Sequence, residues 1–236
     1  MIKTEAIVLS SIQYGETGKI LKCYTQKTGI QSFFVKGSHS KKQKISALFH
    51  PLTQIEVVYK ENKNKSLNHF SEVRQSRHYI NLHSQAEKTC IALFLAEILH
   101  SVLKEEEYNP KLYEFLQNSF LKFDENKNSF ADFHLWFLLN LTVYLGFYPH
   151  LNFNSKYFDL VEGISTDANP GHFFVEGEDL KLLEQLIQLD FFEQSQNQFN
   201  QNQRKSLIDL LLKYYELHIS DFRPPKSLEV LTVIFN

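Results

Sequence analysis

The chain has 236 residues, of which 43% are hydrophobic and 22% are charged. This composition excludes wholesale disorder, and the length suits two modest domains that each bury a core. No window approaches the roughly 18 uncharged apolar residues of a membrane span. The first residues, MIKTEAIVLSS, lack the apolar run of a signal peptide, so the sequence predicts a cytoplasmic protein.

The formal net charge of -2 conceals an uneven distribution along the chain. Residues 1–80 hold 13 Lys and Arg against 5 Asp and Glu, a balance of +8. The whole chain holds 25 Lys and Arg and 27 Asp and Glu. Residues 81–236 therefore hold 12 basic and 22 acidic residues, a balance of -10. This division is typical of a nucleic-acid-binding module joined to an acidic body. The alternative is a solvated basic surface without a polyanionic partner.

Residues 1–80 carry the period-two alternation of β-strands. Short strands are predicted at residues 4–11, 20–25, 30–37, 52–59 and 67–76, joined by turns and one longer basic loop. Five such strands suit a small closed barrel of the OB type, because closure removes unpaired sheet edges. Alternation also predicts that one of Phe33 and Phe34 lies in the barrel core.

After residue 80 the hydrophobic pattern becomes that of helices. Ser84 and Glu87 have the spacing of a capping box before an apolar stripe that runs from Cys90 to Leu103. Further helices are predicted from residue 109 and over 129–145, 180–192 and 205–219. The C-terminal SLEVLTVIF fits either a short helix or a strand, and the helix is favoured. The predicted fold class is α+β, with an OB-fold β-barrel in residues 1–80 followed by an all-α helical domain in residues 81–236.

Two segments of the predicted helical domain lack a helical period. Residues 147–177 are rich in Asn, Gly, Asp and Pro, which predicts a long irregular excursion. Residues 194–203, QSQNQFNQNQ, are predicted to form a polar linker.

The chain carries no sequence motif of a catalytic or metal site. Residues 15–19, GETGK, resemble the end of a phosphate-binding loop, but Gln13 and Ile20 replace the glycine and the hydroxyl residue that this loop requires. His150 and His172 have no Cys or carboxylate partner at a ligand spacing. The sequence therefore predicts no enzyme activity, no cofactor and no metal, although catalytic groups can also converge from distant positions.

The stretch VKGSHSKKQK, residues 35–44, places four lysines and a histidine together without an acidic residue. On a small barrel such a loop can follow a phosphate backbone, with basic residues of neighbouring strands beside it. The predicted DNA-binding residues are Lys19, Lys22, Lys36, His39, Lys41, Lys42, Lys44, Arg74 and Arg77. Because lysines make point contacts to phosphates, this binding is expected to be largely independent of base sequence.

Aromatic residues lie among these basic residues. Tyr14, Phe33 and Phe34 are the candidates for stacking on unpaired bases. Contact with about five phosphates predicts a log–log salt dependence of binding with a slope of about -3.5 to -4.5.

A series of short motifs runs along almost the whole chain. The opening KTEAIVLSSIQYGETGKILKCYTQKTGIQSFFVKGSHSKK contains a T-x-A-I-V-L strand, a Y-G-E turn, a glycine turn and a V-K-G basic loop. Further motifs are HPL at 50–52, YLGFYPHLNF at 144–153, FDLVEG at 158–163 and KSLEVL at 226–231. In this order they resemble the pattern of the bacterial recombination mediator family RecO.

The resemblance implies an N-terminal OB-fold, a C-terminal helical domain and a protein without enzymatic turnover. RecO-like proteins bind single- and double-stranded DNA and anneal complementary strands. They also contact the C-terminal tail of single-stranded DNA-binding protein and work with RecR to help RecA load. The resemblance therefore implies these partners, no membrane, and a cytoplasmic, nucleoid-associated location.

Many RecO-like proteins carry a four-cysteine zinc site in the region that corresponds to residues 147–177. No cysteine occurs there in this chain, and the region instead holds His150, Asn154, Asp167 and Pro170. No zinc is therefore expected. Aromatic residues are expected to pack the segment in its place, namely Phe153, Tyr157, Phe158 and Phe173.

An acidic tail peptide with an aromatic end needs an apolar groove with a cation beside it. The candidates for such a partner groove, on the predicted helix 205–219 and just before it, are Arg204, Lys205, Leu211, Leu212 and Tyr215. The alternative, which is the more common outcome for an apolar stripe, is that the leucines and the tyrosine are core residues.

Other functions remain open on the residues alone. An interaction adaptor would use the barrel to bind a protein and its lysines as solvated surface. An RNA-binding OB module would favour RNA over DNA of equal length, whereas lysine contacts alone predict little preference.

Overall fold

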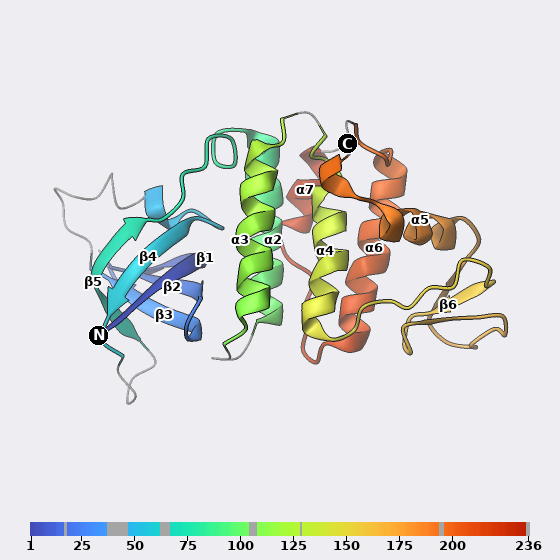
Figure 1. Cartoon of the computed structure of the whole chain (residues 1–236), viewed down its shortest axis with the longest axis horizontal. Coiled ribbons are helices and arrows are strands. Elements are labelled where there is room, and N and C mark those ends of the chain that lie inside the picture. The colour runs from blue at the N-terminus through green and yellow to red at the C-terminus, as the bar shows by residue number, and fades with distance from the viewer. Residues whose placement is uncertain are drawn as a thin grey trace. The chain divides into compact units, whose positions relative to one another are not determined.

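The computed structural model describes residues 1–16, 18–36, 47–61, 67–103, 108–127, 129–193 and 196–234 (Figure 1). The chain forms two compact units. The first comprises Met1–Glu125 with Pro225–Leu231, and the second comprises Asn126–Pro224 with Thr232–Asn236. The first unit thus contains the strands of the N-terminal region together with the first two long helices.

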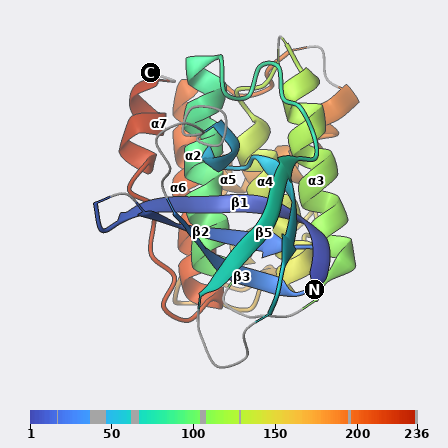
Figure 2. The same cartoon turned by 90° about the vertical axis from the view of Figure 1, so that its left-hand side faces the viewer.

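A closed barrel forms the N-terminal part of the first unit. Its strands are β1 (Ile2–Tyr14), β2 (Gly18–Thr25), β3 (Gly29–Val35), β4 (Gln54–Tyr59) and β5 (Asn68–Gln75). They close in the order β1-β2-β3-β5-β4, and the closing pair β3 and β5 is parallel (Figure 2). The predicted OB-type barrel followed by a helical region is confirmed.

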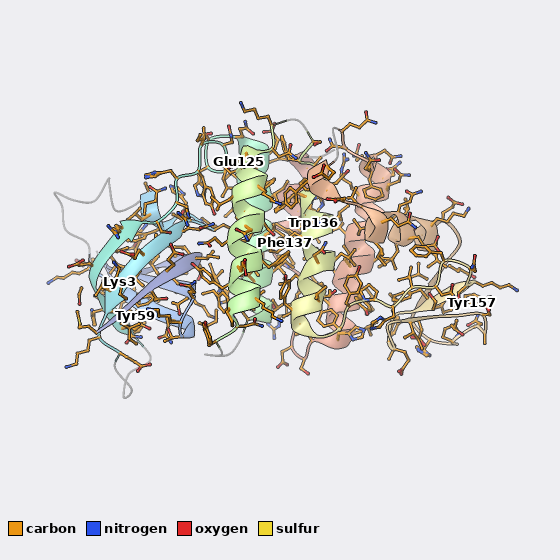
Figure 3. The ribbon with its side chains drawn as sticks, viewed as in Figure 1. Lys3, Tyr59, Glu125, Trp136, Phe137 and Tyr157 are labelled. Atoms are coloured by element: carbon orange, nitrogen blue, oxygen red, sulfur yellow. The ribbon has the colours of Figure 1, made fainter. Side chains whose placement is uncertain are left out.

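The interior of the barrel is aromatic and aliphatic, as the alternation along its strands predicts. Phe33 is fully buried and lies 5.0 Å from the ring of Tyr59 and 4.4 Å from that of Phe70, measured between centroids. Tyr59 lies on β4, within the barrel (Figure 3). Phe34, the next residue on β3, lies on the outside and is only half-buried. The prediction that one of the two phenylalanines belongs to the core is confirmed.

A β-bulge in β1 changes which residues of that strand face outward. Val8 pairs with Cys23 and Ser10 pairs with Lys22, so Leu9 is the additional residue. Before the bulge, Ala6 and Val8 belong to the barrel core. After the bulge, the residues that pair directly with outward-facing residues of β2 are Ser10, Ile12 and Tyr14. The side chains of these three residues therefore face outward as well.

Helices α2 (Ala86–Val102) and α3 (Pro110–Glu125) follow the barrel in the first unit, and α2 packs against β1. The predicted stripe of α2 is buried, including Phe94 and Ile98. The predicted capping box is wrong. Gln85 is the N-cap residue and makes no side-chain cap, while Ser84 Oγ donates to the carbonyl oxygen of Ile80 at 2.7 Å.

The second unit is built around α4 (Phe133–Leu145), which carries Trp136 and Phe137 (Figure 3). Its neighbours are α5 (Gly177–Gln188) and α6 (Gln201–His218). The helix predicted over 129–145 begins only at Phe133, and ends as predicted before Gly146, whose φ of 86° is left-handed. The predicted C-terminal helix is confirmed as α7 (Leu228–Ile234), whose residues up to Leu231 belong to the first unit.

The segment predicted as a polar linker has defined structure where it is described. Asn200 caps α6, because its Oδ1 accepts from the backbone N of Gln203 at 3.0 Å. The Gln203 side chain in turn accepts from the backbone N of Asn200 at 2.8 Å, which completes a capping box. Phe199 is buried. The helix predicted from residue 205 therefore begins at Gln201.

The excursion contains a small antiparallel sheet, which departs from the all-α expectation for residues 81–236. Its strands are β6 (Tyr157–Asp159), β7 (Ile164–Thr166) and β8 (Phe174–Glu176), in the order β7-β6-β8. Of the aromatic residues expected to pack it, Phe158 is buried against Tyr214 of α6. Tyr157 is half-buried, whereas Phe153 and Phe173 are exposed.

Among the residues that the structure describes, no helix combines the length and apolar character needed to cross a membrane.

Candidate nucleic-acid interface

Four residues from four neighbouring strands form a line across the outside of the barrel. Ile12 of β1 lies opposite Ile20 of β2, which lies opposite Phe34 of β3. Phe34 is in turn in register with His69 of β5. Residues that pair directly share one face of a sheet, and here that face is opposite to the side of Leu21 and Phe33 in the core. We call Ile12, Ile20, Phe34 and His69 the outer row.

Aromatic rings give the outer row a defined shape. Tyr14, two residues after Ile12, lies edge-on to Phe34 with ring centroids 5.9 Å apart. On its other side Phe34 lies edge-on to His69, with centroids 5.6 Å apart. Gly18 makes this arrangement possible, because a Cβ there would lie 2.6 Å from Cε2 of Phe34. The rings are therefore held against the β1–β2 hairpin.

The outer row is open to solvent in spite of its apolar character. Ile12 is 57% exposed and Tyr14 is 56% exposed. His69 is also exposed, while Ile20 and Phe34 are half-buried. Large apolar side chains at such exposure on adjacent strands are typical of a binding surface.

Two of the predicted DNA-binding lysines lie near the outer row, Lys22 on the same face and Lys36 just after the end of β3. Lys22 lies opposite Ser32, two residues before Phe34, and Lys36 follows Phe34 by two residues. Lys36 is exposed. Burial lowers the pKa of Lys22. The charge of Lys22 also contributes to the lowered pKa of His100, which lies on α2. Lys22 therefore lies where the outer face of the barrel meets α2.

Lys19 differs from these two lysines. It is half-buried and in register with Val35, which packs against the barrel core. Because the neighbouring residues Ile20 and Phe34 face outward, the side chain of Lys19 leaves the backbone on the opposite face of the sheet, at the end of the barrel.

The predicted arginines lie on or just after β5. Arg74 Nε is 2.6 Å from Glu56 Oε1, which also lies 3.2 Å from Lys3 Nζ. Hydrogen bonding from Arg74, together with the charges of both cations, lowers the pKa of Glu56 despite its partial desolvation. One carboxylate thus neutralises part of this basic cluster. Arg77 is exposed.

The remaining predicted residues divide into two groups. His39, Lys41, Lys42 and Lys44 lie outside the described residues. Phe33 is fully buried, so the prediction that it stacks on a base is wrong, because its ring already packs inside the barrel. Tyr14 and Phe34 keep that candidate role.

The residues proposed for a partner groove lie mostly in the interior of the second unit. Leu211, Leu212 and Tyr215 are buried, and Tyr215 Oη donates to the carbonyl oxygen of Leu138 at 2.8 Å. Arg204 Nη1 lies 3.4 Å from the buried carboxylate of Asp132. Leu211, Leu212 and Tyr215 are therefore core, so the groove prediction is wrong for them, and the partly buried Arg204 is already paired with Asp132. Lys205 alone is exposed.

The excursion holds a histidine–carboxylate pair that sequence spacing does not indicate. His172 Nε2 lies 2.9 Å from Asp159 Oδ1, and the same oxygen accepts from the backbone N of Val161 at 2.8 Å. Desolvation opposes ionisation of Asp159, but backbone hydrogen bonds and His172 outweigh it and lower the pKa of the carboxyl. Within the described ranges, no three His, Cys, Asp or Glu residues are arranged to hold a metal ion.

Sequence reasoning missed Ile12, Ile20 and His69. The strands themselves are readable, but the alternation of β1 is interrupted by the bulge at Leu9, so the outward position of Ile12 follows only from the strand pairing.

Comparison with known proteins gives consistent matches over both parts of the chain. A model described as Recombination protein O N terminal matches residues 1–79, and one described as Recombination protein O C terminal matches residues 83–229. The chain is similar to "DNA repair protein RecO" of Christiangramia forsetii, at 38% identity over 100% of this chain and 99% of that protein. The namesake of Flavobacterium psychrophilum is 37% identical, again over 100% and 99%, and that of Bacteroides fragilis is 35% identical over 99% of each.

Proposed function

Because the chain belongs to the RecO family of DNA repair proteins, we propose that it is a recombination mediator that binds single- and double-stranded DNA and anneals complementary strands. The full-length match to "DNA repair protein RecO" carries this proposal. The balance of +8 in residues 1–80 supports it, because a cationic barrel attracts a polyanion irrespective of base sequence.

Annealing of this kind requires no active site. Two single strands repel each other through their phosphates, and a basic surface that holds both lowers this repulsion. Lysine contacts are weak and point-like, so the strands can exchange position while their base edges stay free for pairing. No catalytic turnover is part of the proposal.

The helical part is proposed to recruit proteins. Its balance of -10 repels DNA, which leaves its surface for other partners. We propose the C-terminal tail of single-stranded DNA-binding protein and RecR as these partners, and assistance to loading of the recombinase as the outcome. This function requires the protein to lie close to the nucleoid in the cytoplasm.

A strand-annealing assay tests the proposal. Two complementary labelled strands are mixed with the protein, with and without prior coating by single-stranded DNA-binding protein, and duplex formation is followed with time. The expected result is faster annealing in both conditions. In parallel, binding to a labelled oligonucleotide is measured at low and moderate salt, and affinity is expected to fall steeply. Absence of binding even in dilute buffer would contradict the proposal and favour a protein-binding adaptor.

A further inference from the structure

The geometry of the outer row points to a more specific role. We infer that Tyr14 and Phe34, supported by Ile12 and Ile20, form a stacking surface for the bases of an unpaired nucleic-acid strand. This inference rests on the proposed DNA-binding function and adds a preference for unpaired strands that lysine contacts alone do not supply.

The first argument is the exposure and arrangement of the rings. Tyr14 is more than half exposed and lies edge-on to Phe34, which Gly18 allows to pack against the hairpin. The position of the Phe34 ring is therefore fixed in advance by its neighbours. A planar, rigid ring at the surface provides contact area at a small entropic cost, and every base has a face that can stack on it.

The second argument is the size of the surface. The outer row spans four adjacent strands, β1, β2, β3 and β5. Neighbouring strands lie about 4.8 Å apart, so the row extends over roughly 14 Å. The isoleucines continue the apolar surface beside the rings across β1 and β2.

The third argument is charge, which identifies the occupant. Neither β2 nor β3 contains an acidic residue. Lys22 lies on the same face as Phe34, and Lys36 is exposed directly after the end of β3, two residues beyond Phe34. An apolar surface between cations matches a chain that carries both aromatic groups and regularly spaced negative charges. An unpaired polynucleotide has these properties, whereas a duplex keeps the faces of its bases stacked on one another.

Abasic oligomers separate stacking from phosphate binding. Fluorescence anisotropy would compare a labelled oligodeoxythymidine, an abasic strand of equal length and charge, and a duplex, all at one salt concentration. The variants are Tyr14→Ala, Tyr14→Phe and Phe34→Leu, since leucine keeps apolar bulk at position 34 without an aromatic face. Tyr108→Ala is the matched control, because Tyr108 is 60% exposed and lies just before α3, outside the outer row.

The wild-type protein is expected to bind the thymidine strand more tightly than the abasic strand. Tyr14→Ala and Phe34→Leu should each raise the Kd for the thymidine strand by about tenfold, within the range measured for loss of one stacked base. For Tyr14→Ala and Phe34→Leu, the Kd values for the abasic strand and the duplex should stay within about twofold of the wild-type values. For Tyr14→Phe and Tyr108→Ala, the Kd values for all three ligands should stay within the same range.

Two results would overturn the inference. One is equal affinity of the wild-type protein for the thymidine and abasic strands, which leaves the proposed DNA binding intact. The other is an equal loss of affinity for all three ligands in Tyr14→Ala. If no ligand binds at low salt, the proposed function itself fails. Should Phe34→Leu unfold in a thermal melt, Tyr14→Ala and Tyr14→Phe still decide, because Tyr14 lies at the surface.

Discussion

Lys88 of α2 donates from Nζ to the backbone carbonyl oxygen of Asp124 on α3 at 2.9 Å, and a second bond reaches the carbonyl oxygen of Phe123 at 2.8 Å. The carboxylate of Asp124 turns the other way and accepts from the backbone N of Ile80, Asn81 and Leu82 at 2.9, 2.7 and 2.6 Å. The last turn of α3 is therefore hydrogen-bonded both to α2 and to residues 80–82, in the segment between β5 and α2.

Replacement of the buried Lys88 by Met should destabilise the protein. The variant keeps the length of the side chain but loses charged hydrogen bonds and leaves two buried carbonyl oxygens without that donor. A loss of about 2 to 4 kcal/mol in unfolding free energy is expected, measured by urea denaturation. Lys111→Met is the control, because Lys111 is exposed on α3 and should change stability by about 0.5 kcal/mol or less. A small effect of Lys88→Met would mean that the network adds little to the fold.

Combined replacement of Lys41, Lys42 and Lys44 by Ala should weaken DNA binding equally for different base sequences. Loss of about three phosphate contacts predicts that the log–log salt slope becomes shallower by about 2 to 3. Titrations at several salt concentrations measure this slope. A matched triple variant, Lys156→Ala, Lys181→Ala and Lys226→Ala, removes three exposed lysines of the acidic part and should leave the slope unchanged. Equal effects of both triple variants would remove the basic loop from the interface.

Glu56→Gln should strengthen DNA binding. Glu56 is bonded to Arg74 and Lys3, so its neutralisation removes one negative charge and releases two cations toward phosphates. A modest decrease in Kd, about two- to fivefold at low salt, is expected from anisotropy titrations. Glu178→Gln is a suitable control, because Glu178 also pairs with an exposed lysine, Lys181, but lies on α5. Unchanged affinity in Glu56→Gln would indicate that Arg74 lies outside the DNA-binding surface.

The buried His134 should make the protein sensitive to acid. Burial, with a contribution from the charge of Arg204, lowers the pKa of His134 from 6.5 to about 3. Between these values the unfolded chain takes up a proton that the folded protein does not, so stability falls as the pH is lowered from about 6.5 toward 3. His134→Leu should reduce the slope of unfolding free energy by about 1.4 kcal/mol per pH unit between about pH 4 and 6.

Denaturation curves at a series of pH values measure that slope, and His78→Leu provides the comparison, because His78 is exposed. Its removal should leave the pH dependence as it is in the wild-type protein. Identical slopes for His134→Leu and the wild-type protein would contradict a neutral buried histidine.

Asp159→Ala should open the small sheet of the excursion without affecting the barrel. The carboxylate accepts from Val161 N, Glu162 N and His172 Nε2, and its pKa is lowered by the backbone bonds and by His172 in spite of desolvation. The stabilisation of the sheet by the ionised Asp159 is therefore present at neutral pH, and it is lost as the pH falls through the lowered pKa of this carboxyl. Hydrogen exchange should become faster over residues 157–176 only. Glu162→Ala, an exposed acid of the same turn, should leave exchange there unchanged.

Much of the fold could be predicted from local pattern. Period-two alternation gives all five barrel strands, and the apolar stripe of α2 gives a buried helix face. The small sheet of the excursion could not be predicted, because strands of three residues, such as Tyr157–Asp159, show no periodicity and depend on bonds to distant segments. The start of α6 was obscured because Asn200 and Gln203 look like low-complexity sequence until their reciprocal bonds are seen.

The candidate site was predictable in its charges and not in its geometry. A cluster of lysines is visible in the sequence, whereas the opposition of Ile12, Ile20 and Phe34 depends on strand register. The proposed partner groove failed for a related reason. An amphipathic pattern shows that Leu211 and Leu212 avoid water, but it cannot tell whether a partner or the protein's own helices cover them.

The additional residue Leu9 in β1 decides what the hairpin offers to its surroundings. If β1 paired regularly through Leu9 instead of bulging there, Ile12 and Tyr14 would exchange places with their chain neighbours and turn from the solvent toward the barrel lumen. The composition would be unchanged, yet the protein would lose its exposed tyrosine at this surface. Deletion of Leu9, in contrast, would join Val8 directly to Ser10 and keep the pairing of Ile12 with Ile20, so the side chains that face the solvent depend on Leu9 staying unpaired.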